Sequence, residues 1–428
     1  MTAILPLNIL IPLLLILLLL LAGVPVLFSL AIGNLLLIQT TDIFQLIFFS
    51  NSLYSGLNSL ALIAIPLFIL TGDAIVESGT AEKLIDFADR IVGGFQTGVG
   101  SSTILGCGLF ASISGSNAAD AAAIGRISYS SLKQYGYPGP YASALIASGA
   151  TTGILIPPSI AYIIIGVTIG VPVGTLFLAS VIPGVLVLSA ILLTNVVINH
   201  SNNYEQGHEF ANLSEIARAT WDAKEALSIP VIILGGIYSG IFTPTESAAV
   251  AVAVVAAIGI VRGTLHLNDF WDLFERSAII NGTIAPLIAV ALSFSQSLNA
   301  LGLPSIIVSV FESIPGGFYA TLLLMLAIFL IAGAILETTP NILLLAPLLY
   351  PVSQNIGMAP VHFAVFMNTA LGIGFITPPF GMNLYVMSSV TSESIAPISK
   401  KSVPFLLVLI LLSILIGIFP SLSTVLVQ

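Results

Sequence analysis

The fold follows from one six-residue motif that occurs twice, as Gly153-Ile154-Leu155-Ile156-Pro157-Pro158 and as Gly374-Phe375-Ile376-Thr377-Pro378-Pro379. Each copy lies inside a long apolar stretch, over residues 140–171 and 360–392. Both stretches are too long for one membrane span, which needs about 20 apolar residues. Because each proline removes a backbone donor and frees a carbonyl one turn earlier, we predict that both stretches are broken helices.

The composition of the chain is typical of a membrane protein. Its 428 residues are 57% hydrophobic and 7% charged, with a mean hydropathy of +1.11. A soluble domain carries roughly 25% charged residues, so the polar surface is too small for a water-soluble globule. This excludes a cytosolic enzyme and a secreted binding module. With 10 Lys and Arg against 19 acidic residues, we expect no nucleic-acid partner, and the single cysteine, Cys107, allows no internal disulfide.

The apolar segments are predicted to be helices rather than strands. Strands of a membrane barrel alternate apolar and polar side chains, and the run from Leu13 to Leu21 does not alternate. Two segments, 117–130 and 341–352, are only about half as long as a span and suit one limb of a re-entrant hairpin. We therefore predict an all-α polytopic membrane protein with re-entrant helical hairpins over 92–130 and 318–352, together with the two Pro-Pro broken helices.

The spacing of the motif predicts an internal repeat. From Gly153 to Gly374 the offset is 221 residues, and this offset places the polar stretch 108–117 near 333–341, which is also polar inside an apolar run. We predict two copies of one plan, over 1–226 and 227–428, each with one hairpin and one broken helix.

Positive charges give the two copies opposite orientations. The first hairpin is flanked by four basic residues, Lys83, Arg90, Arg126 and Lys133, which predicts that it opens to the cytoplasm. The flanks of the second hairpin, 303–319 and 351–359, contain no Lys or Arg. The copies are therefore predicted to be inverted repeats, an architecture typical of secondary transporters, with both termini on the outer side of the membrane.

Three polar segments between the spans, 76–90, 203–226 and 263–277, mix charged and apolar residues. We predict that they are helices lying at the cytoplasmic interface of the membrane; the alternative is that they are loops.

The turn of the first hairpin carries the sequence Ser112-Ile113-Ser114-Gly115-Ser116-Asn117-Ala118-Ala119-Asp120. One helix ends and another begins here, so unbonded carbonyls and unbonded N–H groups meet. The carbonyl and hydroxyl oxygens suit a hard cation such as sodium, whereas the N-terminus of the second helix suits a carboxylate. The alternative is that Ser116 or Asn117 only caps the following helix.

The turn of the second hairpin is Glu337-Thr338-Thr339-Pro340-Asn341. Pro340 is predicted to be a first-turn proline, with Thr339 as the helix cap. Glu337 suggests a function because a carboxylate within a membrane is costly, and its expected partner is a bound cation or a cluster of N–H groups. The alternative is a protonated Glu337 with a structural hydrogen bond.

Repeat symmetry predicts two sodium sites, each formed by a hairpin turn and the broken helix of the same copy. The first is expected to use Ser114, Ser116 and Asn117 with the carbonyls near Gly153 and Pro157. The second is expected to use Glu337, Thr338, Thr339, the carbonyls near Gly374 and the Thr377 hydroxyl. For the substrate we expect contacts from Ser116, Asn117, Asn341, Thr377, Pro378 and Asn383. The alternative for the prolines is a purely structural kink.

Nothing in the sequence indicates enzymatic chemistry. The four histidines, His200, His208, His266 and His362, are scattered and suggest no transition-metal cluster. No phosphate-binding P-loop pattern is present, so we expect no ATP hydrolysis and no organic cofactor. The stretch 243–247 is predicted to be a capped helix start.

With these residues the sequence resembles the large membrane subunit, or permease, of tripartite ATP-independent periplasmic (TRAP) transporters, the DctM family of the ion transporter superfamily. The resemblance covers essentially the whole chain and is carried by the segments 112–125, 156–160, 242–246 and 375–384. Asn117 stands where the family often has Ser, and Glu337 stands where it often has Asp.

The resemblance implies a multi-pass protein of the cell inner membrane with periplasmic termini. It implies import of small organic acids with sodium as the coupling ion, by a transport domain that moves as an elevator against a fixed scaffold. It also implies two separate partners, a small four-helix membrane subunit and a periplasmic solute-binding protein.

Two other functions are weighed against this one. A stand-alone sodium/carboxylate symporter of the same superfamily would need no binding protein. A channel is less favoured, because channels use a continuous pore with charged rings, and the sequence instead shows paired hairpins. An intramembrane protease would need paired catalytic carboxylates or a Ser–His pair at depth, which the sequence does not show.

Overall fold

The computed structural model describes residues 6–41, 46–205 and 210–427, and the regular structure within these ranges is helical throughout. Six helical segments in these ranges are long and apolar enough to cross a membrane, namely Leu60–Glu77, Val173–Asn202, Pro244–Arg262, Asp269–Ala300, Gly317–Ile335 and Ile395–Ile418. The prediction of an all-α protein with many apolar helices is therefore confirmed.

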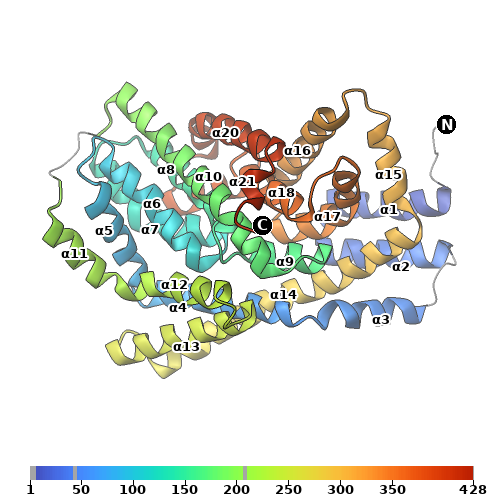
Figure 1. The fold of residues 1–428 in the computed structure, drawn as a ribbon, viewed down its shortest axis with the longest axis horizontal. Coiled ribbons are helices and arrows are strands. Elements are labelled where there is room, and N and C mark those ends of the chain that lie inside the picture. The colour runs from blue at the N-terminus through green and yellow to red at the C-terminus, as the bar shows by residue number, and fades with distance from the viewer. Residues whose placement is uncertain (1–5, 42–45, 206–209, 428) are drawn as a thin grey trace.

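The helices follow one another along the chain as Figure 1 shows. The first part forms α1 (Leu7–Leu21), α2 (Val26–Thr41), α3 (Leu46–Leu57), η1 (Leu60–Ile63), α4 (Ala64–Glu77), α5 (Thr80–Val92), α6 (Gly98–Ser114), α7 (Asn117–Gln134), α8 (Gly139–Gly149), η2 (Ala150–Ile154), α9 (Ile160–Ile169) and α10 (Val173–Asn202). The second part forms α11 (Leu213–Asp222), α12 (Lys224–Tyr238), α13 (Pro244–Arg262), α14 (Leu267–Ala300), α15 (Leu303–Glu312), α16 (Gly317–Ile335), α17 (Thr338–Asn355), α18 (Pro360–Gly374), α19 (Met382–Thr391), α20 (Ile395–Ile418) and α21 (Ser421–Thr424).

Both predicted hairpins are helix pairs with short turns, α6–α7 and α16–α17, and both Pro-Pro motifs lie between two short helices. The helix starts keep the spacing of the motif. Asn117 and Thr338 begin α7 and α17, and Gly139 and Pro360 begin α8 and α18, each pair being 221 residues apart. The division of the chain at residue 226 and the opposite orientation of the two hairpins stay predictions.

The prediction of a separate interfacial helix is wrong for one of the three polar segments. Residues 263–277 do not form a separate helix, because α14 begins at Leu267 and runs without interruption to Ala300. The polar start passes into the apolar remainder as one helix, and Pro286 also lies inside it without ending it. The other two segments contain helices as predicted, α5 and α11, and the sequence prediction missed two short helices, α3 and α15.

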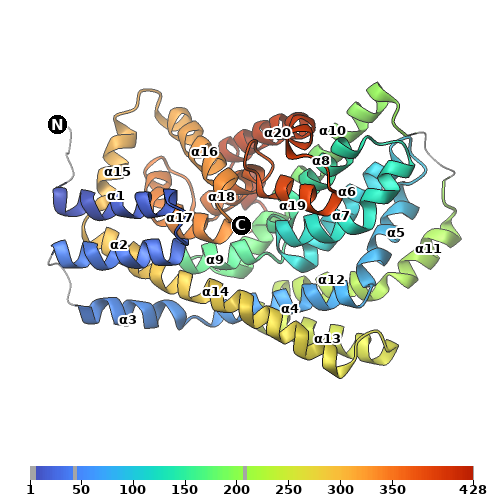
Figure 2. The same cartoon turned by 180° about the vertical axis from the view of Figure 1, so that it is seen from behind.

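One edge of the molecule is a wall formed by α3, α4 and the long helix α14, which α12 and α13 extend (Figures 1 and 2). Polar side chains fasten the wall together. Ser277 of α14 donates to the carbonyl of Pro66 in α4 at 2.8 Å, and Ser52 of α3 donates to Gln296 of α14 at 2.6 Å. The hairpin helices lie beside this wall, so the turns of the hairpins can face it.

A buried carboxylate holds the base of the first hairpin together. Glu205 follows α10 and is 1% exposed. Its carboxylate accepts hydrogen bonds from the N–H groups of Val99 (2.8 Å) and Gly100 (3.4 Å) in the first turn of α6, and from the Tyr137 hydroxyl (2.8 Å). Burial and the Glu205 carboxylate raise the pKa of Tyr137, so its hydroxyl stays a donor. The Asn199 side chain makes two hydrogen bonds to the backbone of Glu205. Its Oδ1 accepts from the Glu205 N–H at 3.1 Å, and its Nδ2 donates to the Glu205 carbonyl at 3.5 Å. We call Glu205, Tyr137 and Asn199 the Glu205 clamp.

Candidate functional site

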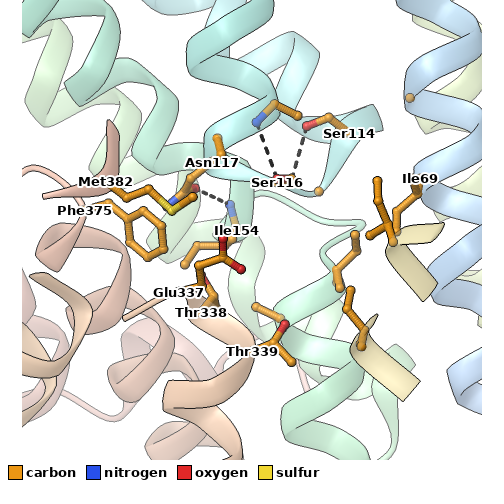
Figure 3. Close-up of a pocket in the computed structure, with 18 of the residues that line it drawn as sticks. Ile69, Ser114, Ser116, Asn117, Ile154, Glu337, Thr338, Thr339, Phe375 and Met382 are labelled. Carbon is orange, nitrogen blue, oxygen red and sulfur yellow. Dashed lines mark hydrogen bonds between the residues drawn. The ribbon is translucent and has the colours of Figure 1, made fainter. Parts of the chain in front are cut away.

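A cavity of about 240 Å³ lies where the turns of the two hairpins meet the wall (Figure 3). Its lining from the wall is Ile69, Gly72, Asp73, Val76, Ile280 and Ile284, and its lining from the first hairpin and broken helix is Phe110, Ser114, Gly115, Ser116, Asn117, Ala118, Ala119, Ile154, Ile160 and Ala161. The second hairpin and broken helix contribute Glu337, Thr338, Thr339, Phe375 and Met382. The cavity therefore joins both copies of the predicted repeat.

The first turn is built by a glycine and a capping serine. α6 ends at Ser114, and Gly115 has a left-handed conformation (φ +62°) that reverses the chain without a side-chain clash. Ser116 is the N-cap of α7, and its hydroxyl accepts from the Ala119 N–H at 3.5 Å. The capping alternative for Ser116 is thus present, and the same residue lines the cavity.

The first turn packs directly onto the first break. Asn117 Oδ1 accepts a hydrogen bond from the Ile154 N–H at 2.9 Å. A Cβ placed on Gly153 would lie 2.8 Å from the Ser116 carbonyl oxygen, so only glycine allows this approach. The structure therefore brings Ser116, Asn117 and Gly153 together, as the repeat argument expected. The carbonyl that approaches Gly115 belongs to Pro158 rather than to Pro157. A Cβ placed on Gly115 would lie 3.1 Å from the Pro158 carbonyl oxygen.

Asp120 is a polar residue of this site that the sequence prediction did not assign. It is fully buried, and its Oδ1 accepts a hydrogen bond from the Ser114 hydroxyl. Its Oδ2 has no hydrogen-bond partner among the described residues and would lie 2.6 Å from a Cβ on Gly153. An oxygen of this kind beside the Ser116 carbonyl fits a hard cation such as sodium. The sequence does contain the signal for Asp120, since a carboxylate within an apolar hairpin indicates a function. In the sequence prediction only Glu337 received this interpretation.

The second turn differs from its prediction in one respect. α17 begins at Thr338, so Glu337 occupies the N-cap position and Pro340 is the third residue of the helix. The prediction of Thr339 as the cap is wrong, because Thr339 is already helical; Pro340 fits since the first N–H groups of a helix lack partners in any case. Glu337 is exposed, and its carboxylate makes no capping hydrogen bond to the start of α17. Figure 3 shows that carboxylate directed into the cavity.

The second break packs against the second hairpin, but Gly374 and Thr377 of this break do not reach the cavity. A Cβ on Gly374 would lie 2.6 Å from the Gly333 Cα, so α18 and α16 touch through two glycines. The Thr377 hydroxyl donates to the Ile373 carbonyl at 3.1 Å. Phe375 and Met382 line the cavity from this side, whereas Gly374 and Thr377 are not part of the lining.

The expected substrate residues separate into two groups. Ser116 and Asn117 line the cavity, whereas Asn341, Thr377, Pro378 and Asn383 do not. The amide of Asn341 donates to the carbonyls of Ala332 (3.0 Å) and Leu336 (2.9 Å), and the amide of Asn383 donates to Ala147 (3.0 Å). These bonds fasten helices to one another.

Charge and helix ends define what the cavity can bind. Its charged lining among the described residues is acidic, Asp73 and Glu337. α7 and α17, each 18 residues long, both begin at the cavity, so the positive ends of two helix dipoles and unbonded N–H groups lie there. The cavity thus combines oxygen atoms for cations with two helix N-termini for an anion.

The family follows from a match over nearly the whole chain. The family described as the tripartite ATP-independent periplasmic transporter, DctM component, matches residues 13–422. The chain belongs to the DctM family. It is therefore the large permease component of a TRAP transporter, a multi-pass protein of the inner membrane and not an enzyme.

Several named proteins are similar along most of the chain. The isethionate TRAP transporter permease protein DctMQ of Oleidesulfovibrio alaskensis is 32% identical over 93% of this chain, which spans only 62% of DctMQ. The C4-dicarboxylate TRAP transporter large permease protein DctM of Pseudomonas aeruginosa is 35% identical over 85% of both chains. The sialic acid TRAP transporter large permease protein SiaM of Vibrio cholerae is 33% identical over 95% of this chain and 96% of SiaM.

A solved structure shares the fold. The crystal structure of the Alcanivorax borkumensis YdaH transporter aligns with a TM-score of 0.61 at 14% identity, covering 88% of this chain and 89% of that one. This similarity concerns the fold alone, that is, the arrangement of the helices over most of the chain.

Proposed function

We propose that this DctM permease imports small organic acids together with sodium ions. The observation that carries the proposal is the cavity between the two hairpin turns, where the N-termini of α7 and α17 meet oxygen-bearing side chains. Helix N-termini favour a carboxylate, and oxygen ligands favour a hard cation. The relatives named for isethionate, C4-dicarboxylates and sialic acid are all named for organic acids.

Two cation sites couple sodium to transport in this proposal. The first uses Ser114, Ser116, Asn117 and the backbone near Gly153 and Pro157, with Asp120 as its charged group. Its support is the packing of the first turn against Gly153 and the unpartnered Asp120 Oδ2.

The second cation site uses Glu337, Thr338, Thr339, the backbone near Gly374 and Thr377. Its support is the placement of Glu337, Thr338 and Thr339 on the cavity. Sodium bound here offsets negative charge, so the anionic substrate binds more readily.

The proposed mechanism is an elevator. The hairpins and broken helices of two inverted repeats, 1–226 and 227–428, move together as re-entrant elements against the wall. The equal spacing of helix starts in the two halves supports this division. In the proposed topology both termini are periplasmic, and the first hairpin opens to the cytoplasm while the second opens to the periplasm.

Two partner proteins complete the proposed transporter, a small four-helix membrane subunit and a periplasmic solute-binding protein. The fact that this chain spans 62% of DctMQ fits a relative that carries a further segment in the same polypeptide. The binding protein delivers the organic acid to the periplasmic side of the permease.

Reconstitution in proteoliposomes tests the function. Under an inward sodium gradient, succinate, sialic acid and isethionate are offered to the purified chain alone and to the chain with both partners. We expect sodium-dependent uptake of one acid only when both partners are present. Robust uptake by the chain alone favours the stand-alone symporter, and uptake that does not depend on the sodium gradient favours a channel.

A further inference from the structure

The wall contributes one charged residue to the cavity, and neither the hairpins nor the proposed cation sites use it. Among the described lining residues, the wall provides Ile69, Gly72, Asp73 and Val76 from α4, and Ile280 and Ile284 from α14. Asp73 is the acidic member of an otherwise apolar surface. A carboxylate within a candidate membrane span is costly to keep, which points to a function.

Asp73 lies next to the first hairpin turn. A Cβ placed on its neighbour Gly72 would lie 3.3 Å from the Ser114 Cα, so α4 touches the turn at this level. Asp73 therefore faces the same space as the proposed first cation site and the N-terminus of α7.

The charges around Asp73 leave its carboxylate only partly balanced. Arg276 and Glu77 both lie within electrostatic range of Asp73. The guanidinium of Arg276 is 3.7 Å from the Glu77 carboxylate, whereas Asp73 has no ion-pair partner within 4.0 Å among the described residues. An anion in the cavity therefore meets a second negative charge besides Glu337. Sodium at the second site would offset Glu337 but not Asp73.

We propose that Asp73 weakens binding of the organic acid in this conformation and thereby promotes its release. The inference rests on the proposed function. Because Asp73 belongs to the wall, it repels the substrate only while the hairpin turns lie beside α4. When the hairpin turns move along the wall, they would carry the acid away from Asp73. The site would therefore bind the acid more tightly when the turns no longer lie beside α4.

Titration calorimetry on the purified full chain in lipid nanodiscs tests the inference, with sodium present and with succinate, sialic acid and isethionate as probes. Asp73→Asn should bind the accepted acid about threefold to tenfold more tightly than the wild type, because a like charge has been removed. Glu82→Gln is the control, since Glu82 is an exposed acidic residue of α5 outside the cavity lining, and the affinity of this variant should equal that of the wild type. In proteoliposomes with both partners, Asp73→Asn should also lower the maximal uptake rate.

A second measurement varies the salt. At constant sodium, added choline chloride screens the repulsion by Asp73 in the wild type only, so the difference in affinity between the wild type and Asp73→Asn should shrink. Unchanged or weaker binding by Asp73→Asn, or an affinity difference that grows with added salt, would overturn the inference. If no probe binds to the wild type or to either variant, the proposed function fails, and this inference fails with it.

Discussion

At the level of single residues, the two hairpins differ in where they carry their carboxylate. Asp120 is the fourth residue of α7, and the fourth residue of α17 is Asn341. The Asn341 amide donates to the carbonyls that end α16, which completes that turn with neutral hydrogen bonds. Asp120 accepts from Ser114 and keeps one oxygen without a partner. The first site is therefore the more negative of the two at this position.

We predict that Asp120→Asn raises the sodium concentration for half-maximal uptake by about tenfold or more, since hydrogen bonds and contacts to a charged group contribute roughly 1.5–3 kcal/mol. The variant should still fold, because an asparagine here can donate to the end of α6 as Asn341 does in the second hairpin. The measurement is uptake as a function of sodium. The control is Asp222→Asn on exposed α11, and equal sodium dependence for the two variants would exclude Asp120 from the cation site.

Among the helices, α11 is unusual because none of its residues is buried. Leu213 (86% exposed) and Trp221 (68% exposed) lie eight residues apart and so share a face of the helix. The Lys224 ammonium lies 3.6 Å from the centre of the Trp221 ring. A tryptophan beside a lysine, on an amphipathic helix between two apolar helices, is typical of the membrane interface.

Fluorescence tests this placement, since the chain has only two tryptophans. In a Trp271→Phe variant, we expect lipids brominated near the headgroup to quench Trp221 more strongly than lipids brominated near the chain ends. Quenching should be equal in neutral and anionic vesicles, because α11 carries Arg218 together with two acidic residues. A Trp221 that no brominated lipid quenches would place α11 in water.

The orientation of the hairpins is tested at their outer ends. Ser130 of α7 and Gln354 of α17 are both exposed. In a Cys107→Ala background, single cysteines at these positions should react with a membrane-impermeant maleimide from opposite sides of the membrane. The comparison uses right-side-out and inside-out vesicles, and labelling of both positions from one side would end the inverted-repeat proposal.

At the scale of the whole molecule, features decided by neighbouring residues could be predicted and features decided by packing could not. Pro157 and Pro378 interrupt helices through their own backbone chemistry, so both breaks were predictable. Asp73 reaches the cavity only because α4 packs against Ser114, and no local pattern indicates this. Asn383 was expected at the substrate but bonds Ala147, which lies 236 residues earlier. Hydrogen-bond partners at that distance depend on the assembled fold.

The Glu205 clamp sets a prediction for global stability. Glu205→Ala leaves the Val99 and Gly100 N–H groups and the Tyr137 hydroxyl without their acceptor, so we expect a loss of about 3–5 kcal/mol, typical of breaking a buried charged contact. Thermal unfolding is followed by a thiol-reactive dye, because Cys107 is the single cysteine and is fully buried. Glu215→Ala, which removes only the capping box of α11, should cost about 1 kcal/mol. Equal losses for the two variants would contradict the role of the clamp.

The same clamp fixes an order of events on the ribosome. The acceptor for the Val99 N–H is made 106 residues later than the group it serves. At a synthesis rate of about 5–20 residues per second, Val99 is made roughly 5–20 s before Glu205 exists. During that interval the nascent first hairpin has open N–H groups at its base, which only water, headgroups or the insertion machinery can satisfy. Insertion of the first hairpin therefore precedes its locking, and a polypeptide that stalls before Glu205 carries a hairpin that nothing yet holds closed.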